Sequence, residues 1–253
     1  MMSAMDYSKV ADLYDIYAQT DLDVPFFLQE SQGCRNVLEL ASGTGRLSLP
    51  LIEAGVRLSC LDNSPEMSAI LRQKLQSKGL TAPIYEMDAS DFTLPEQFDL
   101  IIIPFNSFSE IVEPVTQRAT LTRIHSHLGD TGRLICTLHN PAIRLKIADG
   151  RIHSRGVFAI AGHAGTLVLS SVESYDASTH LVIGAQFYEL YSPDGIMQSK
   201  RFVGIQFYVH FREAFEALVR SQGYKVMALY GDYDRAEFRP EQSPFMIWIL
   251  GKR

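Results

Sequence analysis

Asn36-Val37-Leu38-Glu39-Leu40-Ala41-Ser42-Gly43-Thr44-Gly45-Arg46 is the stretch of sequence that decides the fold. Its apolar run, residues 37–40, ends abruptly in small residues, and a helical pattern of apolar positions begins at Leu47. The stretch therefore predicts a strand, a tight turn and the start of a helix. Gly43 and Gly45 lack a Cβ, so the backbone can turn sharply and a ligand can lie directly against it. Amides at the start of the helix can then bind a negatively charged group.

The composition is that of a soluble globular protein. The chain has 253 residues, of which 46% are hydrophobic and 21% charged, enough to bury a full core. The net charge of −6 argues against a nucleic-acid partner, which normally requires a basic surface. The three cysteines are scattered without a CxxC motif, which indicates reduced thiols and no metal site. No apolar run is long enough to span a membrane, and residues 1–7 carry no signal-peptide pattern. We expect a cytoplasmic protein that does not associate with membranes.

Strands and helices alternate from residue 37 to residue 138. The predicted strands are residues 37–40, 56–61, 83–87, 98–104 and 133–138. The predicted helices are residues 47–54, 65–78 and 116–128, and a turn is expected at residues 129–132. Short apolar strands that alternate with helices indicate βαβ units and a parallel sheet covered on both faces. A last helix, 211–222, and two last strands, 224–230 and 245–250, complete the prediction of a doubly wound, Rossmann-like α/β fold with a mostly parallel seven-stranded sheet.

The pattern changes after residue 150. Four segments rich in β-branched and aromatic residues are separated by turn residues; they are residues 157–160, 166–175, 180–191 and 200–210. We predict an antiparallel β meander that is inserted after the fifth strand and packs on the main sheet. The whole chain, residues 1–253, then forms a single domain. Its parts are an N-terminal helical lid (1–33), a ligand-binding core (34–145), an inserted β roof (151–210) and a closing helix with two strands (211–253).

The N-terminal segment leaves two interpretations open. Val10, Leu13, Tyr14 and Tyr17 share one face of an amphipathic helix. The two tyrosines can simply pack into the core. Alternatively, they belong to a lid that presents phenol groups to a ligand.

Polar residues follow the predicted strands at their carboxyl ends, where ligands bind in open parallel sheets. Asp62 ends the second strand and can accept hydrogen bonds from both hydroxyls of a ribose. Asp88 follows the third strand and can accept a hydrogen bond from the amine of an adenine. Each carboxylate taken singly is also explained as a helix cap or a surface residue. Together they describe an adenosine pocket.

The glycine turn differs from a dinucleotide-binding turn. That fingerprint requires a third small residue, and Ser48 occupies the position here. Glu39, in the strand before the turn, would repel a pyrophosphate. It is better suited to a ligand that carries a positive charge and no phosphate.

Residues 37–138 resemble the class I S-adenosylmethionine-dependent methyltransferases. The resemblance rests on four motifs: Val37-Leu38-Glu39-Leu40-Ala41-Ser42-Gly43-Thr44-Gly45, Leu61-Asp62-Asn63-Ser64-Pro65-Glu66-Met67, Met87-Asp88-Ala89 and Phe98-Asp99-Leu100-Ile101-Ile102. It implies S-adenosyl-L-methionine as the cofactor. One departure is Ala41, which replaces the usual first glycine.

The resemblance also implies a role for each motif residue. The methionine portion of the cofactor is held by Glu39 and by the backbone of Ala41, Gly43 and Gly45. The ribose hydroxyls bind Asp62, and Asn63 and Met67 lie beside the adenosine. The adenine faces Asp88 and Ala89, and the sulfonium region is lined by Pro104 and Phe105.

The outer parts of the chain are similar to a subgroup of small-molecule methyltransferases that includes the N-methyltransferases of amino sugars. These carry an N-terminal segment like Leu13-Tyr14-Asp15 that closes over the cofactor, and an antiparallel insertion that roofs the substrate. The similarity favours the lid interpretation of Tyr14. It also favours nitrogen as the methyl acceptor.

The acceptor decides whether a base is needed, because an amine needs only a free lone pair and a hydroxyl usually needs a base. His139, at the end of the fifth strand, is the candidate base, although it also fits a loop histidine bonded to the backbone. Asn106 is a candidate for orienting the substrate. The Asn-Pro-Pro-Tyr motif that grips a flipped base is absent after the fourth strand, which again argues against DNA.

We therefore expect an enzyme, monomeric or homodimeric, that moves a methyl group from S-adenosyl-L-methionine to a nitrogen of a small molecule. Oxygen is the less favoured acceptor. The alternatives are a nicotinamide-dependent oxidoreductase and a non-catalytic cofactor-binding protein.

Overall fold

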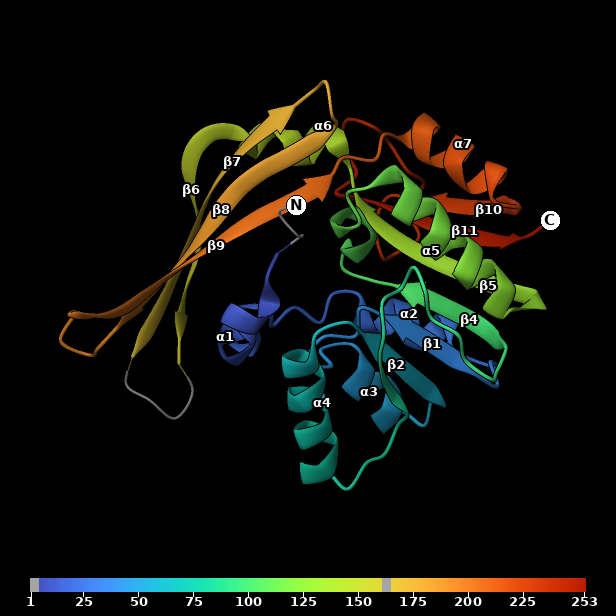
Figure 1. The fold of residues 1–253 in the computed structure, drawn as a ribbon, viewed down its shortest axis with the longest axis horizontal. Coiled ribbons are helices and arrows are strands. Elements are labelled where there is room, and N and C mark those ends of the chain that lie inside the picture. The colour runs from blue at the N-terminus through green and yellow to red at the C-terminus, as the bar shows by residue number, and fades with distance from the viewer. Residues whose placement is uncertain (1–4, 161–164) are drawn as a thin grey trace.

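The computed structural model describes residues 5–160 and 165–253. It contains a seven-stranded mixed sheet with helices on both faces and a second sheet of four antiparallel strands (Figure 1). The predicted fold class, an α/β sheet with an inserted antiparallel meander, is confirmed.

The seven-stranded sheet has the order β10-β11-β5-β4-β1-β2-β3. Its strands are β1 (Val37–Leu40), β2 (Leu58–Asp62), β3 (Ile84–Glu86), β4 (Phe98–Ile103), β5 (Leu128–His139), β10 (Tyr224–Tyr230) and β11 (Phe245–Lys252). Strands β1 to β5 pair in parallel, whereas β11 runs antiparallel to both β5 and β10. The carboxyl ends of the five parallel strands therefore meet at one edge, where a ligand site is expected.

Helices cover both faces of this sheet. They are α2 (Val24–Glu30), α3 (Ser48–Glu53), α4 (Pro65–Ser77), α5 (Pro114–His127), α6 (Pro141–Arg144) and α7 (Arg212–Ser221). Short 3-10 helices are η1 (Tyr7–Lys9), η2 (Ser107–Glu110) and η3 (Leu145–Ile147). Alternate residues of β4 enter two different cores: Leu100 and Ile102 pack with α3 and α4, and Ile101 and Ile103 pack with α5 and α7. This explains why the strand is apolar throughout.

Strand β5 corrects one expectation. Residues 129–132, predicted as a turn, belong to the strand, which begins directly after α5. Phe98 pairs with Leu128 and Leu100 pairs with Arg133. The register between β4 and β5 therefore shifts at this point, and β5 has additional residues between the two pairs. A Cβ at Gly132 would lie 2.8 Å from the Phe98 carbonyl oxygen, so the glycine permits this close approach.

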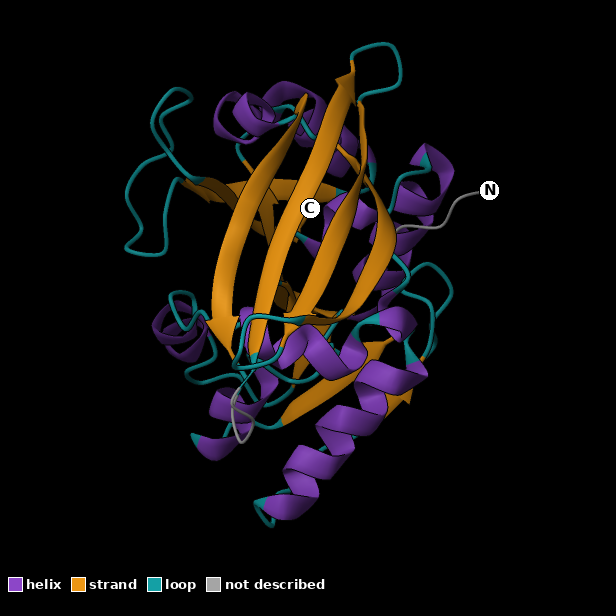
Figure 2. Cartoon of the chain, turned by 90° about the vertical axis from the view of Figure 1, so that its left-hand side faces the viewer, coloured by secondary structure: helices purple, strands orange, loops and turns teal. Residues whose placement is uncertain are grey.

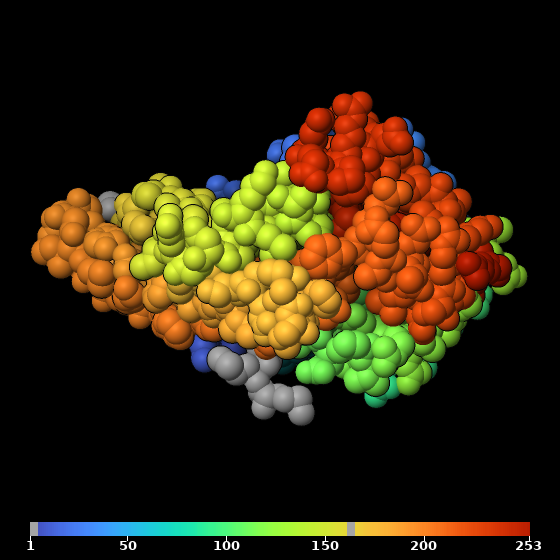
Figure 3. Space-filling model, turned by 90° about the horizontal axis from the view of Figure 1, so that it is seen from above, coloured from blue at the N-terminus to red at the C-terminus, as the bar shows by residue number. Residues whose placement is uncertain are grey.

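The inserted sheet consists of β6 (Asp149–Ala159), β7 (Thr166–Asp176), β8 (Leu181–Tyr191) and β9 (Met197–Tyr208), paired in that order. Strand β6 begins well before the predicted residue 157. Figure 2 shows the four strands side by side, with no helix in front of the face turned to the viewer. In the view of Figure 3 the sheet extends from the rest of the molecule as an arm.

The inserted sheet packs on the N-terminal segment, and it meets the main sheet, its predicted partner, where Phe207 of β9 lies beside His139 of β5. Leu167, Leu169, Tyr188 and Val203 form a core with residues at the start of α1 (Ala11–Tyr17), chiefly Val10 and Leu13. Helix α1 also contacts α4 of the main layer. The apolar face of α1 thus lies between the two sheets, because it supplies the partner that the inner face of the insertion needs.

Candidate cofactor and substrate site

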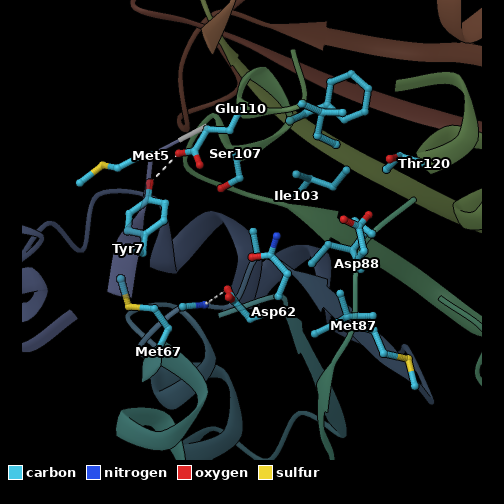
Figure 4. Close-up of a pocket in the computed structure, with 18 of the residues that line it drawn as sticks. Met5, Tyr7, Asp62, Met67, Met87, Asp88, Ile103, Ser107, Glu110 and Thr120 are labelled. Atoms are coloured by element: carbon cyan, nitrogen blue, oxygen red, sulfur yellow. Dashed lines mark hydrogen bonds between the residues drawn. The ribbon is translucent and has the colours of Figure 1, made fainter. Parts of the chain in front are cut away.

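A cavity of about 360 Å³ lies at the carboxyl ends of the parallel strands. It is lined by residues that follow β1, β2, β3 and β4, by η2 and the start of α5, and by the N-terminal segment (Figure 4). Its volume is typical of a small-molecule site, roughly 300–1,000 Å³. In the view of Figure 4, Tyr7 and Glu110 lie at one side of it, Asp88 and Met87 at the other, and Asp62 between them.

The glycine-rich turn enters the left-handed backbone region at alternate residues: φ is 55° at Ala41, 55° at Gly43 and 86° at Gly45. Ala41 and Gly43 line the cavity. Gly45 does not, and a Cβ there would lie 2.3 Å from Leu71 Cδ1. Of the three positions predicted to hold the methionine portion, Ala41 and Gly43 thus line the cavity, whereas Gly45 allows α4 to approach the turn.

Asp62 is fixed by two backbone amides. Gly43 N–H donates to Oδ2 at 2.7 Å and Ser64 N–H donates to Oδ1 at 2.8 Å. The side chain is nearly buried, and burial raises the pKa of its carboxyl group. Both oxygens keep a further lone pair, so the carboxylate can still accept two hydroxyls. Asn63 and Met67 line the cavity beside it, as predicted.

Glu39 lies behind the turn and does not line the cavity. Only 2% of the residue is exposed, and the Ser48 hydroxyl donates to Oε2 at 2.6 Å. Burial raises the pKa of Glu39 to about 8. Ser48 occupies the position at which a dinucleotide-binding turn has its third small residue. Here its hydroxyl donates a hydrogen bond to Glu39 instead.

Asp88 and Ala89 line the far end of the cavity. Asp88 Oδ1 accepts hydrogen bonds from the Ser90 backbone N–H at 2.7 Å and from the Ser90 hydroxyl at 2.6 Å. The carboxylate therefore caps a local turn, and the exposed residue also lines the cavity.

The segment after β4 departs from the prediction, because Pro104, Phe105 and Asn106 do not line the cavity; their neighbours Ile103 and Ser107 do. Phe105 and Asn106 have φ values of 56° and 66°, and the Arg46 guanidinium lies 4.5 Å from the centre of the Phe105 ring. Asn106 Oδ1 is buried and receives no hydrogen bond from the described residues. Strain of this kind is often stored beside functional sites.

His139 ends β5 outside the cavity. Burial, together with the nearby Arg144 and Arg155, lowers the pKa of its imidazole to about 3. A group with so low a pKa is a poor proton acceptor at neutral pH. The geometry does not support the predicted role of His139 as a base.

The N-terminal segment reaches the cavity through Met5, Tyr7 and Tyr14. Tyr17, one turn further along α1, packs instead on Tyr188, with ring centres 5.7 Å apart. The Tyr188 hydroxyl donates to the Tyr17 hydroxyl at 3.3 Å. Tyr14 therefore lines the cavity, whereas Tyr17 packs on the inserted sheet.

Glu110 and Tyr7 were missed by the sequence reasoning. The Tyr7 hydroxyl donates to Glu110 Oε1 at 2.6 Å, and both residues line the cavity. Desolvation raises the pKa of Glu110 to about 7. A signal was available in the sequence: Glu110 is an acidic residue between Phe108 and Ile111, in the loop after the fourth strand.

The described residues contain no group of three or more His, Cys, Asp or Glu side chains that could hold a metal ion. Within the same residues, no helix is both long and apolar enough to cross a membrane.

Comparison with known proteins matches residues 37–132 to the family described as a methyltransferase domain. The chain is 30% identical over 133 residues to the glycine/sarcosine N-methyltransferase of Aphanothece halophytica, an alignment that covers 51% of this chain and 50% of that protein. The chain spans about half the length of the curated relatives it matches.

Solved structures agree with the fold over nearly the whole chain. A S-adenosylmethionine-dependent methyltransferase from Clostridium acetobutylicum ATCC 824 has a TM-score of 0.79 at 17% identity, covering 97% of this chain and 98% of that one. The sugar N-methyltransferase KedS8 from Streptoalloteichus sp. ATCC 53650 has a TM-score of 0.71 at 20% identity, covering 98% and 88%. Identities this low show the shared fold alone. Residues 37–132 thus match a methyltransferase domain, and the sheet order and the fold shared with solved methyltransferase structures agree with that match.

Proposed function

We propose that the protein transfers a methyl group from S-adenosyl-L-methionine to a nitrogen of a small molecule. The observation that carries the proposal is the charge of the cavity. Its described lining contains four carboxylic acids, Asp62, Asp88, Glu110 and Glu113, and no lysine, arginine or histidine. Such a wall favours cationic ligands and disfavours phosphates.

The residues present fit this cofactor. We propose that Asp62 accepts its ribose hydroxyls, that Asn63 and Met67 lie beside the adenosine, and that Asp88 and Ala89 face the adenine. The backbone at Ala41 and Gly43 would hold the methionine portion. When bound, the cofactor supplies a methyl group on a cationic sulfur, and the protein supplies orientation and a dry environment.

Tyr7 and Tyr14 act as a lid in this proposal. Both come from the N-terminal segment, and Tyr14 is nearly enclosed, so that burial raises the pKa of its phenol. A closed segment excludes water from the reacting atoms, which is the main requirement of a displacement of this kind.

Nitrogen is favoured over oxygen because the acidic lining suits an acceptor that arrives as a cation, and because the candidate base outside the cavity, His139, has a pKa of about 3. The named activities of two similar proteins, a glycine/sarcosine and a sugar N-methyltransferase, support the same choice. A small molecule fits a cavity of about 360 Å³.

A nicotinamide-dependent oxidoreductase is the weaker alternative. Its pyrophosphate would meet the buried Glu39 behind the turn and the acids of the cavity, with no cation in the described lining to balance it. Isothermal titration calorimetry with S-adenosylhomocysteine and with NADH separates the two. We expect micromolar or tighter binding of S-adenosylhomocysteine only; binding of NADH alone would overturn the proposal.

A second experiment separates an enzyme from a non-catalytic binding protein. The protein is incubated with S-adenosylmethionine labelled on its methyl group and with a metabolite extract, and the labelled products are identified by mass spectrometry. Label on an amine is the expected result. Binding of the cofactor without labelling of any compound would favour the non-catalytic alternative.

A further inference from the structure

We propose that Glu110, with Tyr7 as its hydrogen-bond donor, binds the ammonium group of the substrate and accepts its proton before methyl transfer. This inference rests on the proposed function and deepens it, since it names the substrate class as a primary or secondary amine that arrives as a cation. Tyr7 is a positioning residue in this scheme, because it acts through Glu110.

The position of Glu110 carries the inference. It is the last residue of η2, the 3-10 helix that follows β4, and it lines the cavity. Tyr7 reaches Oε1 from the N-terminal segment at 2.6 Å, and no other hydrogen bond to the carboxyl group is made by the described residues. Oε2 is therefore left to bind a ligand.

The charges around Glu110 point to a cation. The ionisable groups that interact with it are Tyr7 from η1, Tyr14 and Tyr17 from α1, and Asp62 at the end of β2. None of them can carry a positive charge, and no described residue forms an ion pair with Glu110. A half-buried, desolvated carboxylate without a cationic partner is unfavourable in its charged form, so a ligand that brings the cation is favoured.

The other acidic groups near the cavity differ from Glu110 in their hydrogen bonds or in their exposure. Asp62 accepts two backbone amides, Asp88 accepts two hydrogen bonds from Ser90, and Glu39 is sealed behind the turn with Ser48. Glu113 is exposed to solvent. Glu110 is thus the carboxyl group of the cavity that is neither exposed to solvent, as Asp88 and Glu113 are, nor held by two backbone amides, as Asp62 is.

The same environment suits proton transfer. Burial and the proximity of Asp62 raise the pKa of Glu110 to about 7. In water the pKa values of an alkylammonium and a glutamic acid differ by about 6. When the pKa of the glutamic acid is about 7, the difference falls to roughly 3. The ammonium gives one proton to the carboxylate, which leaves the amine with the lone pair needed to attack.

Protons and charges balance over the whole reaction. The ammonium loses one proton and gains one methyl group, so the product keeps a single positive charge. The proton held by Glu110 reaches solvent when the product leaves. Tyr7 belongs to the N-terminal segment that lines the cavity, so its hydrogen bond joins that segment to Glu110.

The test uses two cofactor analogues and requires no known substrate. S-adenosylhomocysteine is neutral at the sulfur, whereas sinefungin carries an amino group at the equivalent position and is cationic there. Calorimetry compares wild type, Glu110→Gln, Tyr7→Phe and the control Glu53→Gln, which removes an exposed carboxylate of α3 that pairs with Lys78 at 2.6 Å.

We expect Glu110→Gln to lower the affinity for sinefungin by about tenfold or more. The affinity for S-adenosylhomocysteine should change by less than about twofold. At pH 6.5, sinefungin binding should release a proton from wild type, measured in two buffers of different ionisation enthalpy. This release should disappear in Glu110→Gln and persist in Glu53→Gln. Tyr7→Phe retains the carboxyl group but removes a donor to its charged form, so the release should extend to higher pH.

Equal weakening of the two analogues by Glu110→Gln, or unchanged proton release, would overturn the inference and leave the proposed function intact. Failure of wild type to bind S-adenosylhomocysteine would instead overturn the proposed function. A third assay with labelled cofactor offers glucosamine and glycine beside their hydroxyl analogues glucose and glycolic acid. Methylation of the hydroxyl compounds alone would show that the substrate is not an amine, while methyl transfer as the reaction would stand.

Discussion

Thr44 donates its hydroxyl to Asp15 Oδ1 over 2.6 Å, and this bond joins helix α1 to the glycine-rich turn. Lys74 of α4 completes the connection, since its Nζ lies 2.5 Å from Asp15 Oδ2 and 2.9 Å from the Thr44 carbonyl oxygen. Asp15 directly follows Tyr14, so the same contacts fix where Tyr14 meets the cavity. The segment proposed as a lid is thus anchored to the turn proposed to hold the cofactor.

Removal of this anchor should weaken cofactor binding more than it weakens the fold. We expect Asp15→Ala to lower the affinity for S-adenosylhomocysteine by about 1–2 kcal/mol, because two charge-assisted contacts of α1 are lost. Calorimetry gives the affinity and thermal unfolding gives the stability. Asp21→Ala, an exposed change of equal charge, is the control. An affinity that matches the control would show that the anchor does not act on the cofactor.

Asp62 is the residue on which the cofactor assignment depends most. Asp62→Ala leaves the Gly43 and Ser64 amides, and the proposed ribose hydroxyls, without their acceptor. We expect a loss of about 1–3 kcal/mol in the binding of S-adenosylhomocysteine, measured by calorimetry. Asp91→Ala removes a carboxylate that is 80% exposed in its pair with Arg123 and serves as the control. Unchanged affinity in Asp62→Ala would refute the ribose role.

Ala41 carries a strain that glycine would relieve. Its φ of 55° costs an L-residue roughly 1–2 kcal/mol, part of which is offset by the greater freedom of glycine in the unfolded chain. Ala41→Gly should therefore stabilise the protein by about 0.5–1 kcal/mol in urea unfolding. Ala54→Gly, at a residue with φ of −79°, should destabilise it. A loss of stability in both variants would contradict the strain argument.

Glu39 and Glu110 should make the cofactor-free protein less stable as the pH rises. Burial raises their pKa values to about 8 and about 7, so the folded state holds protons that the unfolded state has already lost. Their stabilising contribution is complete below the ordinary glutamate pKa and is lost as the pH rises through these values.

For Glu39 the change amounts to roughly 4 kcal/mol between pH 4 and pH 8, taken as an upper bound. We expect the Tm of wild type to fall over this range and that of Glu39→Gln to fall less, since Gln can still accept the Ser48 hydrogen bond. Glu53→Gln, at an exposed position, should follow wild type. If the Tm of Glu39→Gln and that of wild type fell equally with pH, the assignment of the raised pKa to Glu39 would be contradicted.

His139→Ala should have little effect on methyl transfer. The imidazole lies outside the cavity, 6.3 Å from the centre of the Phe207 ring, and its low pKa makes it a weak base. We expect a rate within about threefold of wild type, whereas loss of a general base typically costs about 10²–10⁴-fold. A loss of that size with unchanged cofactor affinity would restore His139 as the base.

The sequence alone predicted the features that depend on local pattern. Alternation of strands and helices indicated the sheet, and the positions of Asp62, Asp88 and the Ala41–Gly45 turn at strand ends indicated the cofactor site. The predicted sheet is confirmed, and Ala41, Gly43, Asp62 and Asp88 line one cavity, because the carboxyl ends of parallel strands must meet at one edge.

Tertiary structure decided which of these side chains face the cavity. Glu110 meets Tyr7 across 103 positions of the chain, whereas His139, at a strand end like Asp62, does not line the cavity. The inner face of the inserted sheet lies on Val10 and Leu13, which no local pattern connects to it. The sequence by itself determined the elements and the edge at which the ligand site forms. The lining was decided by contacts between distant residues, because burial and charge at each position depend on which segment comes to cover it.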